Sequence, residues 1–352
     1  MFVANGGNDF SEGDLMMRKV LLTTTALIAL GSVSAVAADI SISGNARFRY
    51  NTWSDDNAAV AGENNNSMTD VLQLWVKSSA TLDNGLSIGT NHRFLTSGAV
   101  DRNWIDIDGD FGKIDLGKQW SVNYSSSLDE NWMGTVAGGA YTGGSTNAGL
   151  SAMGSQKSGF LGGGKANKVV YHMPSIGGLS AAISYGDAGA TSEADETATA
   201  VSYKMDVMGG GLRLQYANIE TDGANATSNE TAGTEFGAEY SGSFGRVYMI
   251  SQNTETTTSA GAKTSDIEGT TFGGQYNLNS ATKIVYYRRE MEQDGTTNLG
   301  DDYSSDTIGV RYDMAGGLRI GVLHTNYDFT DASAAATSDN GSATRLQVRV
   351  NF

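Results

Sequence analysis

"RLQVRVNF", residues 345–352, closes the chain with strict alternation of polar and apolar side chains. Successive side chains of a β-strand point to opposite faces, so the stretch predicts a strand whose apolar face carries Leu346, Val348 and Val350. Arg345 and Arg349 fall on the opposite face. Terminal residues of soluble domains usually fray and gain little from being apolar. This ending therefore indicates a final strand that is paired and has an apolar neighbour on one side.

The same period of two recurs upstream, and no stretch after residue 38 has clear helical periodicity. We expect sixteen strands in all, with the stretch 103–119 forming two strands around a tight turn. The other predicted strands are 40–53, 71–82, 85–96, 168–173, 178–186, 197–207, 211–220, 234–243, 245–255, 270–278, 281–292, 306–314, 317–329 and 343–352.

The connections between these segments alternate in length. Short glycine-rich turns at 83–85, 208–211 and 315–317 alternate with longer polar loops, as at 55–68, 186–196, 221–233 and 330–342. Transmembrane barrels of outer membranes have short periplasmic turns, long external loops and an even strand count. The prediction is thus an all-β, 16-stranded antiparallel transmembrane β-barrel, wide enough for an aqueous channel. A secreted β-sandwich is the alternative, but it does not account for the alternating connections.

Composition narrows the function classes. The chain of 352 residues has no Cys, which excludes disulfides and thiolate metal sites. Its formal charge of −16 argues against nucleic-acid or anionic-membrane partners, which require basic surfaces. The acids gather in the predicted external loops, where they would concentrate cations, so the composition favours weak cation selectivity.

The N-terminal region predicts export. Arg18 and Lys19 precede a short apolar run at 20–30, and Ala35-Val36-Ala37 supplies a cleavage site, so residues 16–37 form a predicted signal peptide. A transmembrane anchor is the alternative, but the apolar run is short for a span. Residues 1–15 are unsuited to a signal peptide and are interpreted as an upstream mis-assigned start. The predicted barrel domain occupies residues 38–352.

One connection, residues 120–167, is much longer than the others and has no strand pattern. Loops of this length are usually functional or disordered, and the aromatic residues in this one favour packing over disorder.

Three stretches carry a resemblance to a known family. GDFGKIDLGKQ at 109–119, NKVVYHMPSIGGLSAAISYG at 167–186 and the final Phe352 resemble the trimeric general porins of Gram-negative bacteria, those of alphaproteobacteria in particular. The resemblance covers the whole predicted mature chain. It implies a homotrimer in the cell outer membrane in contact with lipopolysaccharide. It also implies that Phe352 is read by the barrel assembly machinery, and that residues 120–167 are the third external loop, folded inward as a constriction loop.

In this family, acids of the constriction loop face bases of the barrel wall. The resemblance implies that Asp129 and Glu130 are the acids. The chain lacks the Pro-Glu-Phe-Gly-like turn that many porins carry in this loop, so which acid reaches the constriction stays open. For every charge, the alternative is a solvated loop or rim residue. The implied wall bases are Arg47, Arg49, Lys77, Arg93 and, by position in the motif rather than by alternation, Lys118.

Other motifs have simpler explanations. GFLGGGKA at 159–166 lacks the Ser or Thr of a phosphate-binding loop, and DIDGD at 106–110 has the wrong spacing for a calcium loop and predicts a turn. The acidic loop at 300–302 is a possible loop-bound Ca²⁺ site. The three histidines form no catalytic pattern, so no enzyme is expected.

The sequence therefore predicts a passive diffusion channel for small hydrophilic solutes and ions, without a cofactor. Two alternatives stay open. One is a substrate-specific porin, which a single solute would block at low concentration. The other is a structural or adhesive surface barrel whose lumen is occluded, which would not conduct.

Overall fold

Sixteen strands form one closed antiparallel barrel in which each strand pairs with its sequence neighbours. The computed structural model describes residues 39–55, 64–126, 128, 164–186, 195–222, 229–295, 300–332 and 339–352. The predicted signal peptide and upstream segment lie outside these residues. The strands are β1 (Asp39–Asp55), β2 (Asn64–Thr81), β3 (Ser87–Leu95), β4 (Val100–Gly109), β5 (Gly112–Gln119), β6 (Ala166–His172), β7 (Leu179–Gly186), β8 (Glu196–Val207), β9 (Gly210–Thr221), β10 (Glu230–Gly242), β11 (Gly245–Thr257), β12 (Lys263–Asn277), β13 (Thr282–Gly295), β14 (Asp301–Asp313), β15 (Leu318–Thr330) and β16 (Asp339–Asn351).

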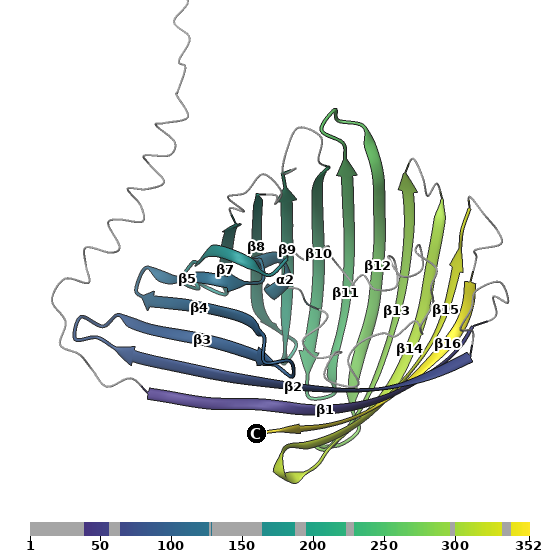
Figure 1. Ribbon diagram of the computed structural model, residues 1–352, viewed down its shortest axis with the longest axis horizontal. Helices are drawn as coiled ribbons and strands as arrows, with labels where there is room; N and C mark the ends of the chain where they lie inside the picture. The colour runs from purple at the N-terminus through teal and green to yellow at the C-terminus, as the bar shows by residue number, and fades with distance from the viewer. Residues whose placement is uncertain are drawn as a thin grey trace, which may run out of the picture.

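The barrel closes where the last strand meets the first, so the predicted role of the C-terminal stretch is confirmed. β1 and β16 pair from Asn45 opposite Asn351 to Asp55 opposite Gly341. Beyond β16, the backbone of Phe352 exchanges two hydrogen bonds with Gly44, at 2.8 and 3.1 Å. The C-terminus therefore lies beside β1, as Figure 1 shows. Closure leaves no strand edge unpaired, which a sheet in a bilayer requires.

The outer face of the barrel is apolar although it is exposed. Phe48, Phe236 and Ile308 have exposed fractions of 45, 53 and 54%. Tyrosines stand near the short turns at Tyr203 and Tyr276 and, like their apolar neighbours, have outward parity. Exposed apolar side chains and aromatic residues near a rim are the features of a lipid-facing barrel surface. The polar face of each strand consequently lines the lumen.

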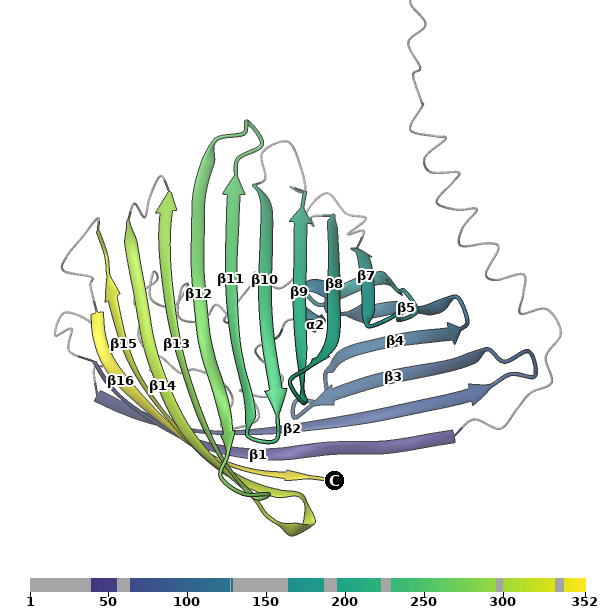
Figure 2. The same ribbon diagram turned by 180° about the vertical axis from the view of Figure 1, so that it is seen from behind.

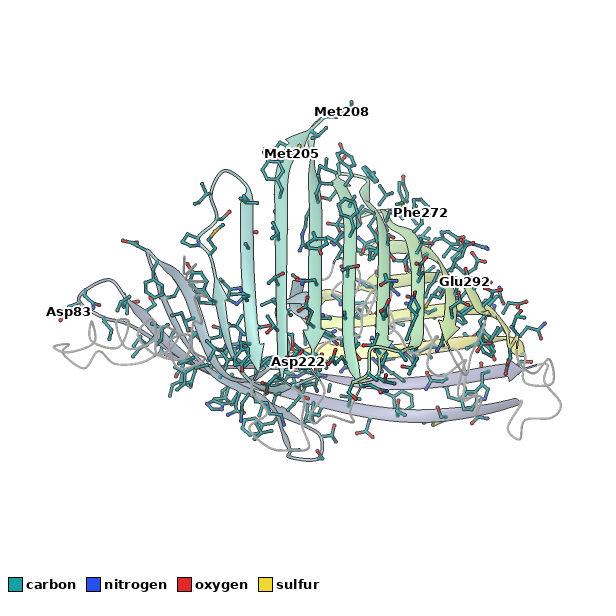
Figure 3. All side chains as sticks on the ribbon, turned by 90° about the horizontal axis from the view of Figure 1, so that it is seen from above. Asp83, Met205, Met208, Asp222, Phe272 and Glu292 are labelled. Carbon is teal, nitrogen blue, oxygen red and sulfur yellow. The ribbon has the colours of Figure 1, made fainter. Side chains whose placement is uncertain are left out.

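The two rims differ. The turn rim carries the tight connections, for example Met208-Gly209, where both residues have positive φ, at 51 and 77°. Such a two-residue turn matches the twist of a hairpin. The loop rim carries the longer connections, although those at 96–99, 258–262 and 296–300 are also short, so the predicted alternation of loop length is not strict. Met208 and Asp222 mark the opposite ends of β9 in Figure 3.

Among the described residues, two short helical elements accompany the strands: α2 (Val122–Ser126) and the 3₁₀ turn η1 (Ala315–Gly317). α2 follows β5 and lies against β8 and β9 on the inner side of the wall (Figures 1 and 2). Within the described ranges, no helix has the length and apolar character needed to cross a membrane.

Candidate functional site

The lumen side of the strands carries most of their basic residues. Cross-strand pairing aligns Arg47 with Arg349 and Lys283 with Arg311, on the face opposite the exposed apolar residues. Lys118 and Arg288 stand at the alternate positions of their strands, which they share with the exposed apolar residues, so they have outward parity. The bases at lumen-facing positions are Arg47, Arg49, Lys77, Arg93, Arg102, Lys113, Lys168, Lys204, Arg213, Arg246, Lys283, Arg289, Arg311, Arg319, Arg345 and Arg349.

Three of these arginines form one row across the seam of the barrel. Arg349 on β16 has Arg47 on β1 as its Cα partner on one side and Arg319 on β15 on the other. We call these three residues the arginine row. Like charges directly opposite each other across strands destabilise a sheet. The arginine row therefore destabilises the folded barrel, and packing of the strands does not explain why three arginines stand there.

Amide groups, rather than carboxylates, orient two arginines at this seam. Arg49 Nε donates to Gln347 Oε1 at 2.8 Å, and Arg349 Nε donates to Asn351 Oδ1 at 2.7 Å. An amide oxygen accepts a hydrogen bond without neutralising the guanidinium. These contacts hold the side chains in place and leave their positive charge available to the lumen.

Arg319 of the row also belongs to a cluster in which three bases share one carboxylate near the turn rim. Asp313 lies 2.7 Å from Arg311 Nη2, 2.7 Å from Arg319 Nε and 3.8 Å from Lys283 Nζ. We call these four residues the Asp313 cluster. Since one negative charge serves three positive ones, this part of the wall is also net positive.

A second cluster lies on β3 and β4. Asp101 forms ion pairs with Arg93 Nη1 at 3.2 Å and Arg102 Nε at 3.4 Å, and a contact with Lys165 Nζ. We call these four residues the Asp101 cluster. The register between β3 and β4 shifts at Arg93, so that Asp101 is an extra residue in β4. This bulge turns the Asp101 carboxylate, which strict alternation would point outward, toward the lumen-side bases.

Aromatic rings adjoin the Asp101 cluster. Trp75 on β2 and Trp104 on β4 meet edge to face, with ring centroids 5.8 Å apart. Arg102, Lys77 and Arg93 lie over the Trp75 ring at 5.0, 5.3 and 5.7 Å from its centroid. These distances are those of cation–π contacts.

The same cluster reaches the start of the long segment. Trp120 stacks on Tyr124 with ring centroids 3.9 Å apart, and Lys165 Nζ lies 4.8 Å from the Trp120 centroid. We call Trp75, Trp104, Trp120 and Tyr124 the ring group.

The start of the long segment is also fixed to β6, β8 and β9. Val122 is buried against inward-facing Val170, Ala198 and Ile219. Its backbone N–H donates to Ser184 Oγ at 3.1 Å, and the Arg213 guanidinium donates to the carbonyl of Ser126 at 2.8 Å. These contacts seat α2 inside the barrel.

A buried ion pair supports this anchor. Lys168 Nζ lies 2.5 Å from Glu196 Oε1, and the Lys168 side chain is 1% exposed. The Ser121 hydroxyl donates to the same carboxylate. The pair thus ties the residue before α2 to both β6 and β8.

Leu128 extends the anchor along the wall to β11 and β13. It packs with Tyr248, Ile250 and Val285 on the inner faces of β11 and β13. A Cβ on Gly237 would come within 2.5 Å of Leu128 Cδ1, so the absence of a side chain at this lumen-facing position leaves room for Leu128. Residues 120–126 and 128 therefore lie within the barrel, as an inward-folded loop requires. The remainder of the predicted constriction loop up to residue 163 lies outside the described residues.

The predicted wall bases are placed unequally. Arg47, Arg49, Lys77 and Arg93 have lumen-facing parity and lie on the neighbouring strands β1, β2 and β3. The prediction for Lys118 was wrong. β5 pairs without irregularity from Gly112 to Gln119, so Lys118 shares its parity with the outer face.

The predicted loop acids, Asp129 and Glu130, lie outside the described residues. Sequence reasoning missed Asp101, because its position depends on the bulge. It also missed the arginine row, which depends on strand register. The alternation within β16 did signal that Arg345 and Arg349 lie on the polar face of the strand.

The other sequence motifs yield no site. Gly109–Gly112 forms the tight turn between β4 and β5, and Asp106 accepts a hydrogen bond from Asn91 Nδ2 at 2.5 Å. In the part of the chain that the structure describes, no group of three or more His, Asp or Glu side chains is arranged to hold a metal ion. Asp301 belongs to the acidic loop for which the sequence analysis named Ca²⁺ as a ligand. Its carboxylate accepts a hydrogen bond from the backbone N–H of Ala332 at 3.0 Å.

Known proteins resemble the chain in both sequence pattern and fold. A family model described as Gram-negative porin matches residues 23–351. No curated protein sequence matches the chain.

Among solved structures, a loop L8 deletion mutant of OmpT, an outer membrane protein of Vibrio cholerae, superposes with a TM-score of 0.68 at 14% identity, covering 90% of this chain and 100% of that one. An anion-selective porin from Comamonas acidovorans gives 0.68 at 13% identity, with coverage of 90 and 100%. A triple mutant of Rhodopseudomonas blastica porin gives 0.59 at 18% identity, with coverage of 89 and 100%. At these identities the structures show a shared fold, while the family match covers nearly the whole barrel. The chain belongs to the Gram-negative porin family.

Proposed function

We propose that this outer-membrane channel for passive diffusion prefers small hydrophilic anions to cations. The arginine row carries the proposal, since three guanidinium groups meet there across neighbouring strands. Clefts lined by one sign of charge raise the local concentration of the opposite ion. An anion that passes the seam would exchange part of its hydration for these donors, whereas a cation would meet repulsion.

The long segment adds little opposing charge. Between residues 120 and 165 its acids are Asp129 and Glu130, and its bases are Lys157 and Lys165. We propose that the two acids face Arg47, Arg49, Arg93 and Lys77 across the constriction. Opposed charges there would orient polar solutes in a transverse field. Even so, the segment has no net charge with which to compensate the basic wall.

This proposal departs from the weak cation preference that composition suggests. Composition counts all acids alike, but the lumen-facing positions are rich in arginine while many acids belong to loops and to the outer face, as Glu290 and Asp306 do. The anion selectivity named for the Comamonas porin supports the proposal by analogy of fold alone.

The direct test is the zero-current potential of the purified channel in a planar bilayer with a tenfold KCl gradient. We expect a sign that corresponds to faster passage of chloride than of potassium. A potential of the opposite sign would refute the anion preference.

The assembled form is proposed by relation to the family. The trimer form of the Vibrio OmpT structure supports a homotrimer. We further propose cleavage of residues 16–37, contact with lipopolysaccharide and recognition of Phe352 by the assembly machinery. Deletion of Phe352 should lower the amount of folded barrel in the outer membrane and leave the conductance of each inserted channel unchanged. Wild-type levels of the deletion variant would contradict the role of Phe352.

We also propose that the protein acts without catalysis. His92 and His324 have outward parity, and His324 Nδ1 lies 2.8 Å from the Thr344 hydroxyl. His172 faces the lumen, but its ring nitrogen lies 3.2 Å from Asp115 in a contact that suits a structural role. No nucleophile, base and orienting acid come together at these positions.

A further inference from the structure

We propose that the Asp101 cluster and the ring group form a retention site for small anions that also carry an apolar ring surface. Such solutes include aromatic carboxylates and sugar acids, which share a charged oxygen group next to an apolar ring surface. The inference rests on the proposed function, because it requires anions to enter the lumen, and it adds a solute class to it.

The first argument is the direction in which the charges are presented. The Asp101 side chain is 4% exposed, whereas those of Arg93, Arg102 and Lys165 are 14, 18 and 29% exposed. The carboxylate therefore lies behind its three bases and orders them. A solute that approaches from the lumen meets the basic side chains first, together with the exposed ammonium of Lys77.

The second argument is the placement of the rings. Trp75, Trp104, Trp120 and Tyr124 are all partly exposed rather than buried. Their rings lie next to these bases, as the contacts of Arg102 with Trp75 and of Lys165 with Trp120 show. The partly exposed rings and the basic groups can thus contact one small solute at the same time.

The third argument is the contrast with the Asp313 cluster. Both clusters place three bases around one aspartate, yet the described cation–π contacts lie at the Asp101 cluster and at none of Arg311, Arg319 or Lys283. Charge alone would make the two clusters equivalent for a simple anion. The rings distinguish the Asp101 cluster and add an attraction that depends on solute shape.

Retention must be weak if the solute is to pass. Conduction requires binding that favours entry but still permits exit. A site on one side of the lumen wall meets this condition, because it contacts one face of the solute and leaves the other in water. We therefore expect brief occupancy that lowers the ion current.

The test compares four solutes on the wild-type channel in a planar bilayer. Benzoate and glucuronate carry a charge and a ring, acetate carries a charge alone, and glucose carries a ring alone. We expect saturable reduction of the current by benzoate, glucuronate or both, at concentrations at least tenfold lower than acetate or glucose requires. A stronger effect of benzoate would identify aromatic acids as the solutes that the site retains. A stronger effect of glucuronate would identify sugar acids. Equal effects of all four solutes would overturn the proposal.

Variants then locate the site. Trp75→Leu should raise the half-blocking concentration of the active solute at least tenfold, because it removes the ring over which Arg102, Lys77 and Arg93 lie. Trp75→Phe keeps a ring and should retain most of the block. Trp53→Leu removes a lumen-parity tryptophan from β1, away from the cluster, and serves as the control. An equal loss in Trp53→Leu, or none in Trp75→Leu, would refute this location. A cation-selective wild-type channel would instead overturn the proposed function.

Discussion

The two sides of the lumen are built from the same alternating strands but use their inward positions differently. From β13 around to β4, these positions carry guanidinium and ammonium groups, including the arginine row and both aspartate-centred clusters. On β6 to β11, small and apolar residues stand among the bases at these positions and hold α2 and, together with Val285 on β13, Leu128. The first side presents charge to the solute and the second positions the loop. We therefore expect substitutions on the two sides to change different properties of the channel.

The largest effect should follow from removing the buried ion pair between Lys168 and Glu196, on the side of the lumen that positions the loop. Glu196→Ala would leave the Lys168 ammonium, which is 1% exposed, without its carboxylate partner. An unpaired buried charge of this kind costs about 3–5 kcal/mol. The temperature at which the purified barrel unfolds in detergent should fall clearly, while the ion selectivity of channels that do insert should not change.

A double variant provides the control for this loss. Lys168→Met combined with Glu196→Leu replaces the pair by apolar groups of similar size, a change that is often nearly neutral. We expect most of the lost thermal stability to return. A double variant as unstable as Glu196→Ala would show that the pair itself is not the cause.

A smaller effect should follow at Gly237. A valine there would collide with Leu128, which lies 2.5 Å from the position of the new Cβ, and would push the loop toward the lumen. Overpacking of this type costs roughly 1–3 kcal/mol. The single-channel conductance should fall. Gly233→Val is the control on the same strand face, because a Cβ at Gly233 meets its neighbours at 3.4 Å. Equal conductance changes in both variants would contradict the contact with Leu128.

The smallest effect tests the corrected position of Lys118. Lys118→Gln removes a charge from the outer-face side of β5 and should leave the zero-current potential unchanged. Lys77→Gln removes the same charge from an exposed lumen-facing position and should shift the potential toward cations. If Lys118→Gln shifted the zero-current potential as much as Lys77→Gln, the Lys118 side chain would have to face the lumen.

The fold was predictable because one local rule determines most of it. Alternation in stretches such as 345–352 reveals both the strand and its two faces, and the number of such stretches reveals the size of the barrel. The same rule would have excluded Lys118, which was included because of its position in a family motif. The local rule was therefore more reliable than the motif.

The candidate site was less predictable because it depends on pairing between distant strands. Arg47 and Arg319 both meet Arg349 only through the registers of three strands. Trp75 and Trp104 lie on strands that do not pair with each other and meet across β3. Asp101 turns inward only because of a bulge. None of these relations follows from the spacing of residues along the chain.

The central claim is that lumen-facing charge, rather than total charge, determines ion selectivity. The most direct measurement compares the zero-current potentials of two double variants that each remove two positive charges. Arg47→Gln with Arg349→Gln removes them from the arginine row. Lys263→Gln with Arg288→Gln removes them from exposed ion pairs at the tip of the β11–β12 hairpin and on the outer face of β13. We predict that the first pair lowers the chloride-to-potassium permeability ratio by about tenfold, equivalent to roughly 1.4 kcal/mol, and that the second leaves it unchanged. Equal shifts in the two variants would contradict the account.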